Sequence, residues 1–376
     1  MVVAMKRRFL AAAITFLLLF GADMHAQSAA TAEALTQQGR LPEAEQAWRS
    51  VIAVHPGDAA AIASLGLVLS HEEKYADAAE AYRRALKLNP KLPGVELNLG
   101  LAEFKQSNLR QAIPAFQAAL REQPSSLQVR TLLGMTYYGT GQFAQAVPLL
   151  QSAVNRAPQN TELRGVLAQA CLHAKQYNCT LEQYKAIVTA NPDSAQAHIL
   201  AGEADDGLNR IDDAVAEFEA AEKVAPQEPN VHFGLGYLLW KQHKYAEAAK
   251  EFEEELANEP NHAPAAAYLG DTQLKLDQRA NAEATLEKAV KMPGAPRLAW
   301  VDLGTALADE HKNEEAAAAL ERAIQMDPNQ VDAHWRLARL YQAEGKTELA
   351  RAEFAKASAL HQKEDQSLVQ QMTPQK

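Results

Sequence analysis

The chain has 376 residues, of which 47% are hydrophobic and 22% are charged, and its formal net charge at pH 7 is -10. Because an acidic surface repels phosphate backbones, we expect no nucleic-acid partner. A globular chain of this length would form two or three domains, but an aromatic content of only 6% favours helices packed against helices.

The first 26 residues have the three-part layout of a secretory signal peptide. Basic residues at positions 6–8 precede an uncharged stretch over 9–20, and small residues follow near Ala26. The stretch is too short to span a bilayer comfortably. We expect cleavage after Ala26 or Ser28, and the alternative is an uncleaved signal anchor, which would be the chain's membrane attachment. In both cases the basic residues stay inside, so we predict export to the periplasm or the extracellular space.

A period of 34 residues organises the chain beyond this segment. Proline recurs at this spacing, with the last interval doubled, at positions 56, 90, 124, 158, 192, 226, 260 and 328. Ten repeats fit end to end from His25 to Glu364 without an insertion. With each proline counted as repeat position 32, repeats two and seven both carry Leu-Gly at positions 7 and 8, tyrosine at 17, alanine at 20 and an aromatic residue at 24.

This pattern resembles the tetratricopeptide repeat. The resemblance implies an all-α fold, a right-handed superhelical solenoid of antiparallel helix hairpins over residues 27–364, with residues 365–376 as the end of the last helix and a polar tail. Small residues at positions 8 and 20 let the two helices approach closely, and proline at 32 stops the second helix. A single hairpin cannot bury its apolar face, so neighbouring hairpins must stabilise one another.

The two cysteines, Cys171 and Cys179, stand at positions 11 and 19 of repeat five, one on each expected helix and close to the hairpin turn. Their spacing resembles that of helical cysteine-rich repeat proteins, relatives of this family whose hairpins are stapled by disulfides. The resemblance therefore implies a disulfide, and an exported chain favours it. The alternative is two separate buried thiols, because free cysteine packs as a small hydrophobe.

No arrangement of residues indicates catalysis. The sequence has no Gly-x-Ser-x-Gly elbow, no Walker-type loop and no His-Glu-x-x-His pair. His198, His232 and His334 share repeat position 4, so we expect them to pack between hairpins rather than to bind a metal. We predict a chain that is not an enzyme and that uses no cofactor and no metal.

Function is therefore expected at a surface. In tetratricopeptide arrays the first helix of each hairpin lines a concave groove, chiefly through positions 2, 5, 9, 12 and 13. Transferred to this chain, the resemblance gives a more acidic middle that includes Glu203 and Asp206, flanked by two apolar and aromatic patches. Their main residues are Leu101, Phe104, Met135 and Tyr138 in repeats three and four, and Phe233, Tyr237, Trp240 and Trp335 in repeats seven and ten. The alternative for the aromatic residues is packing against adjacent helices.

We expect a scaffold or adaptor of the bacterial cell envelope that binds other proteins or peptides in this groove. Two alternatives stay open. The chain could be the recruiting subunit of an envelope glycosyltransferase or polysaccharide export complex, or its groove could bind carbohydrate, with Tyr237 and Trp240 as platforms. The sequence does not determine the oligomeric state.

Overall fold

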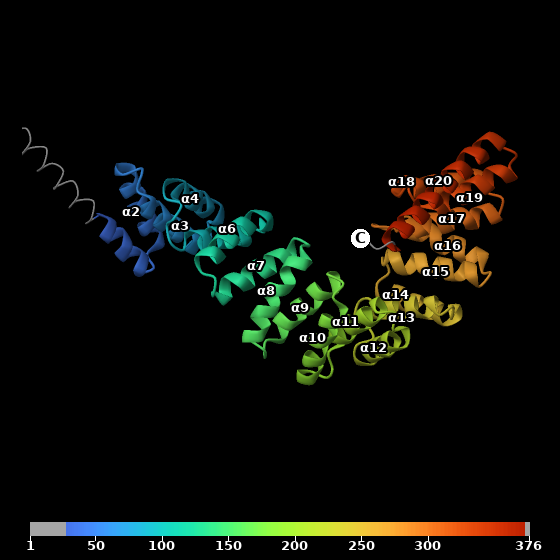
Figure 1. The fold of residues 1–376 in the computed structure, drawn as a ribbon, viewed down its shortest axis with the longest axis horizontal. Coiled ribbons are helices and arrows are strands. Elements are labelled where there is room, and N and C mark those ends of the chain that lie inside the picture. Colours follow the sequence, from blue (N-terminus) through green and yellow to red (C-terminus); the bar gives the residue numbers. More distant parts are fainter. Residues whose placement is uncertain (1–27, 373–376) are drawn as a thin grey trace, which may run out of the picture. The chain divides into compact units, whose positions relative to one another are not determined.

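The computed structural model describes residues 28–372, and every regular element in this range is a helix (Figure 1). The predicted signal peptide and the last four residues lie outside the described residues. An all-α fold of paired helices is thereby confirmed. Within residues 28–372, no helix combines the length and the apolar character that crossing a membrane requires.

The chain divides between Gln176 and Tyr177 into an N-terminal and a C-terminal unit, each described here by itself. The N-terminal unit begins with a helix over residues 28–37. Its other helices are α2 (Leu41–Val54), α3 (Ala59–His71), α4 (Tyr75–Leu88), α5 (Val95–Lys105), α6 (Leu109–Glu122), α7 (Leu127–Gly139), α8 (Phe143–Arg156) and α9 (Thr161–His173). The pairs α3–α4, α5–α6 and α7–α8 are hairpins, and the second helix of each also packs on the first helix of the next.

The C-terminal unit repeats this arrangement. Its helices are α10 (Tyr177–Ala190), α11 (Ala195–Gly207), α12 (Ile211–Val224), α13 (Val231–Lys241), α14 (Tyr245–Asn258), α15 (Ala263–Lys275), α16 (Arg279–Ala289), α17 (Arg297–Asp309), α18 (Asn313–Met326), α19 (Val331–Ala343) and α20 (Thr347–Met372). From α11 to α19, the first helices of successive hairpins also contact one another. The first helices therefore form one layer of this unit, on which the groove positions of the repeat lie.

The glycine at repeat position 8 is the closest approach within a hairpin. A Cβ atom on Gly236 would lie 2.8 Å from the ring of Phe252, which fills position 24 and is fully buried. Gly100 and Phe116 stand in the same relation in the N-terminal unit, at 2.6 Å. A larger residue at position 8 would push the two helices apart, so the predicted roles of positions 8 and 24 are confirmed.

The turn inside each hairpin needs one residue with a left-handed backbone. Gly141 supplies it after α7 with φ 75°, at no steric cost. His311 occupies the equivalent place after α17 with φ 62°, a conformation that a side chain disfavours. The hairpin geometry therefore overrides the local preference of the residue.

Two elements depart from the regular repeat. Helix α16 has 11 residues instead of the usual 14 of a second helix, and a turn with Gly294 at φ 74° leads from it to α17. This is the segment where Met292–Pro296 replaces the single proline of the other repeats. The last helix, α20, has 26 residues and continues beyond Glu364.

Candidate binding site

Helix α13 presents three of the predicted groove residues on one face, since repeat positions 5, 9 and 12 lie three or four residues apart. The ring centroids of Phe233 and Tyr237 are 6.5 Å apart, and those of Tyr237 and Trp240 are 6.2 Å apart with planes 14° from parallel. All three side chains are half-buried. The predicted contact residues of repeat seven thus form one continuous aromatic surface.

Tyr268, from the neighbouring first helix α15, joins this surface. Its ring centroid lies 5.9 Å from Phe233, 5.4 Å from Tyr237 and 5.3 Å from Trp240, each time edge to face. This geometry is favourable for aromatic pairs. Sequence reasoning missed Tyr268, because its repeat position, 6, is outside the groove positions of the family. The four residues Phe233, Tyr237, Trp240 and Tyr268 are called the aromatic cluster below.

A buried glutamate fixes the start of the helix that carries this cluster. Asn230 precedes α13 with a left-handed φ of 69°. The carboxylate of Glu255, on α14, accepts hydrogen bonds from the backbone N–H groups of Asn230 and Phe233, both at 3.0 Å. These N–H groups have no partner within the helix, and the helix dipole favours a negative charge there. Glu255 therefore holds α13 in place from beneath.

A cavity of about 220 Å³ lies beside the cluster. Its lining comes from α11, α12 and α13 and combines apolar with acidic side chains, namely Glu203, Asp206, Phe218, Asn230, Phe233, Gly234, Tyr237 and Leu238. Gly234 has no side chain to fill this space, and a Cβ atom there would lie 2.1 Å from the ring of Phe218. We call this space the α11–α13 cavity.

The two carboxylates of the cavity differ in their partners. Asp206 is paired with Lys241, whose ammonium nitrogen also lies 5.5 Å from the centroid of the Tyr237 ring. Glu203 has no ion pair or hydrogen bond among the described residues, although it lines the same cavity. Its side chain reaches solvent, but the surrounding groove removes enough water to raise the pKa of Glu203 above its usual value.

On the other side of the cluster, the indole N–H of Trp240 donates a hydrogen bond of 2.6 Å to Asp271. Asp302, on α17, is 3% exposed, and its Oδ2 atom has no hydrogen-bond partner within the described residues. Burial, and then the charge of Asp271, raises the pKa of Asp302 to about 7, while Arg336 and Lys275 act in the opposite direction. The C-terminal unit therefore keeps an incompletely compensated carboxyl group behind its groove.

The histidines at repeat position 4 each contact a glutamate 19 residues further along the chain. The ring Nδ1 atoms of His198, His232 and His334 lie 2.7, 2.8 and 2.6 Å from the carboxylates of Glu217, Glu251 and Glu353. Glu222 also places a ligand atom within reach of His232 and Glu251. Because the same pair recurs in three hairpins, contact between the two helices of a hairpin explains it.

In the N-terminal unit the four predicted groove residues, Leu101, Phe104, Met135 and Tyr138, are half-buried. Phe104 packs edge to face on Phe116 at 6.4 Å. The Tyr138 hydroxyl donates a hydrogen bond to Gln169, and its ring lies 5.8 Å from Phe143. Within residues 28–176, no ring contact joins Phe104 to Tyr138, so their patch is a set of separate packing contacts.

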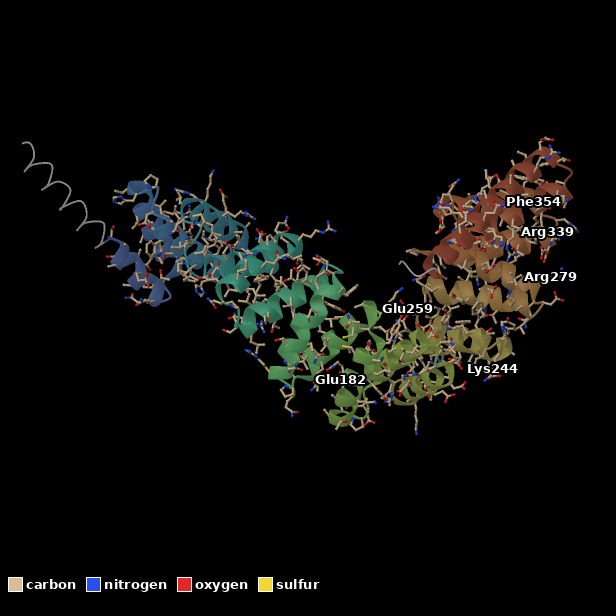
Figure 2. The ribbon with its side chains drawn as sticks, viewed as in Figure 1. Glu182, Lys244, Glu259, Arg279, Arg339 and Phe354 are labelled. Carbon is tan, nitrogen blue, oxygen red and sulfur yellow. The ribbon has the colours of Figure 1, made fainter. Side chains whose placement is uncertain are left out.

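The remaining predicted residues lie elsewhere. Trp335, on α19, is 46% exposed, and the guanidinium of Arg339, labelled in Figure 2, lies 4.9 Å from its ring centroid. Cys171 lies on α9 and Cys179 on α10. Both are in the disulfide-bonded form, and neither is a free thiol.

Comparison with known proteins identifies the family. Two family models, both described as tetratricopeptide repeat, match the chain, one over residues 103–170 and 307–372, the other over residues 30–93, 201–264 and 233–296. The chain belongs to the tetratricopeptide repeat family, whose members typically act as scaffolds that bind other proteins or peptides. No curated protein matches the sequence significantly.

Solved structures agree with the fold. The Cut9–Hcn1 hetero-tetramer of the APC/C is similar with a TM-score of 0.51 and 13% identity, over 88% of this chain and 86% of that one. A tetratricopeptide repeat protein from Parabacteroides merdae reaches a TM-score of 0.49 and 16% identity, over 66% and 98% of the two chains. YrrB, described as having an unusual peptide-binding site, reaches a TM-score of 0.42 and 22% identity, over 50% and 98%.

Proposed function

We propose that the chain is a non-enzymatic scaffold that binds a segment of another protein at the aromatic cluster. The observation that carries this proposal is the cluster itself. Its four rings contact one another on two adjacent first helices, and each stays partly exposed. Tyrosine and tryptophan dominate the energetics of many interfaces, and a polar rim around them is typical. A role in packing alone would favour full burial of the rings.

We place this scaffold in the bacterial envelope, with the repeats exported. The basic, apolar and small-residue layout of residues 1–26 supports export. The disulfide-bonded form of Cys171 and Cys179 supports an oxidising compartment. Thiol counting on unreduced, denatured protein tests the second point. We expect no free thiol, and two free thiols would remove that support.

A pull-down from envelope extract tests the binding function. The bait is the processed chain from Gln27 onward, beside a Tyr237→Ala, Trp240→Ala double variant. Phe104→Ala, Tyr138→Ala is the matched control, because it removes two aromatic side chains from the same kind of helix in the N-terminal unit. We expect a partner that the wild type and the control retain and the first variant loses.

The identity and behaviour of the captured proteins decide between the remaining versions of this function. Capture of a transferase or an export component would make the chain its recruiting subunit. Equal capture by all three baits would place binding outside the aromatic cluster and contradict the proposal.

The near-parallel rings of Tyr237 and Trp240, 14° apart, also favour a second candidate, a platform for the flat face of a sugar. A glycan array with the same three proteins tests it. Binding that is lost in the Tyr237→Ala, Trp240→Ala variant would support carbohydrate recognition. Glycan binding that survives both substitutions would eliminate this platform as the carbohydrate site.

A further inference from the structure

The size of the α11–α13 cavity limits what can occupy it. Its volume of about 220 Å³ is below the roughly 300 to 1,000 Å³ of sites for drug-sized molecules and cofactors. The cavity opens beside Phe233 and Tyr237, which also belong to the aromatic cluster. A segment bound at the cluster therefore has room to place one long side chain in the cavity.

The lining indicates which side chain that is. Phe218, Phe233 and Leu238 offer apolar surface, whereas the polar end of the cavity consists of Glu203 and Asp206. Lysine and arginine combine a long apolar stem with a cationic head. An acidic side chain would be repelled here, and an apolar one would leave the carboxylates without a partner.

The balance of charge points the same way. Lys241 neutralises Asp206, but Glu203 has no cationic partner among the described residues. The cavity therefore has a net negative charge of one. Lys241 also shows that a cation is accommodated here, because it lies beside a cavity carboxylate and over the face of Tyr237. The raised pKa of Glu203 is consistent with a carboxylate that lacks a counter-charge.

We propose that the α11–α13 cavity is a specificity pocket for a lysine or arginine side chain of the bound segment, with Glu203 as its counter-ion. The stem of that side chain packs between Phe218 and Phe233, and its head pairs with Glu203 next to the Lys241–Asp206 ion pair. This inference rests on the proposed function, since it requires a segment at the aromatic cluster.

Selection from a phage library of random dodecapeptides on the processed chain tests the inference. We expect the enriched peptides to share a basic residue at a fixed distance from an apolar or aromatic one. One such peptide is then synthesised with its lysine or arginine and, separately, with norleucine at that position. Affinities are measured by fluorescence anisotropy with wild type, Glu203→Gln and Glu254→Gln. Glu254 is the control, because it is an exposed glutamate on the second helix α14.

Loss of one charge-assisted contact is expected to weaken binding about tenfold. The norleucine peptide should lose that factor with the wild type, and Glu203→Gln should lose it with the basic peptide. The two changes together should cost little more than either alone, whereas Glu254→Gln should change neither affinity. A Glu203→Lys variant should recover binding when the basic residue of the peptide is replaced by glutamate.

The outcomes separate this inference from the function on which it rests. Enriched peptides that require Tyr237 and Trp240 but contain no shared basic residue would overturn the pocket and keep the groove function. Equal losses from Glu203→Gln for the basic and the norleucine peptide would also overturn it, because the carboxylate would then act without the cation. If no peptide is enriched on the wild type, both proposals fail.

Discussion

The two units carry aromatic residues at the same repeat positions and use them differently. In the N-terminal unit, Phe104 and Tyr138 are on different helices, and each packs against a neighbour of its own. In the C-terminal unit, positions 5, 9 and 12 of one helix, α13, are all aromatic, and Tyr268 completes the surface. A repeat position therefore determines where a ring lies, whereas its neighbours decide whether it forms part of a binding surface.

The units also treat buried carboxylates differently. Glu103, in the N-terminal unit, is 1% exposed but pairs with Arg83 and accepts a hydrogen bond from Asn108 at 3.1 Å. Asp302 is buried to a similar degree and keeps one oxygen without a partner. Burial of a charge is costly unless it is paired. The N-terminal unit thus spends its polar groups on stability, and the C-terminal unit does not.

The largest difference should come from repeat position 24. Phe252→Ala removes a fully buried ring that contacts Phe233 at 6.1 Å and Tyr268 at 5.9 Å. We expect a loss of about 4 kcal/mol, against about 3 kcal/mol for Phe116→Ala, which loses one ring contact. Hydrogen exchange followed by mass spectrometry measures α13–α14 and α5–α6 separately. Equal losses would show that the aromatic cluster adds no stability of its own.

The buried carboxylates should respond to substitution in opposite directions. Asp302→Asn removes the unpaired charge, and we expect a gain of about 2 to 4 kcal/mol above pH 7. Glu103→Gln breaks a paired group, and we expect a loss of about 1 to 3 kcal/mol at the same pH.

The gain from Asp302→Asn should depend on pH. The folded-state pKa of about 7 lies above the ordinary value of 3.8, so between these values the folded chain binds more protons than the unfolded chain. Its stability therefore falls as the pH rises from about 4 to about 7, and the Asn variant lacks this fall. Urea unfolding at pH 4 and pH 8 measures it. An advantage of the variant that is equal at both pH values would contradict the raised pKa.

A smaller difference is expected between two tryptophans. Trp240→Phe loses the hydrogen bond to Asp271 and should cost about 1 to 2 kcal/mol. Trp335→Phe changes a side chain that is 46% exposed and should cost less than about 0.5 kcal/mol. Hydrogen exchange in α13 and α19 measures both changes. Greater sensitivity of α19 would show that Trp335, rather than Trp240, is the tightly held ring.

The smallest effects should come from the hairpin turns. Gly141→Ala introduces a side chain at φ 75° and should cost about 1 kcal/mol. His311→Gly relieves the same strain at φ 62° and should add about 0.5 kcal/mol. Thermal unfolding followed by circular dichroism detects both shifts. A destabilising His311→Gly would mean that the histidine side chain makes a contact worth more than the strain.

Much of the fold could be predicted from the sequence, because a hairpin repeat writes its packing as a period. Gly236 and Phe252 each followed from their position in that period. The site was only partly predictable. Tyr268 joins the cluster through a contact between helices 31 residues apart along the chain, Trp240 to Asp271, which a position-by-position reading does not reveal. The α11–α13 cavity depends on the missing side chain of Gly234, and the orphan oxygen of Asp302 depends on the absence of a nearby donor among the described residues.

The equivalence of Gly236 with Phe252 and of Gly100 with Phe116 has a consequence for how such a chain changes over time. Duplication of one 34-residue segment would supply every new helix with a complementary neighbour, because each repeat brings both the small and the large member of the pair. Unequal recombination could therefore lengthen the array without disturbing its register. A copied α13 would carry its three aromatic residues with it, so recognition surfaces could multiply and then diverge while the original was retained.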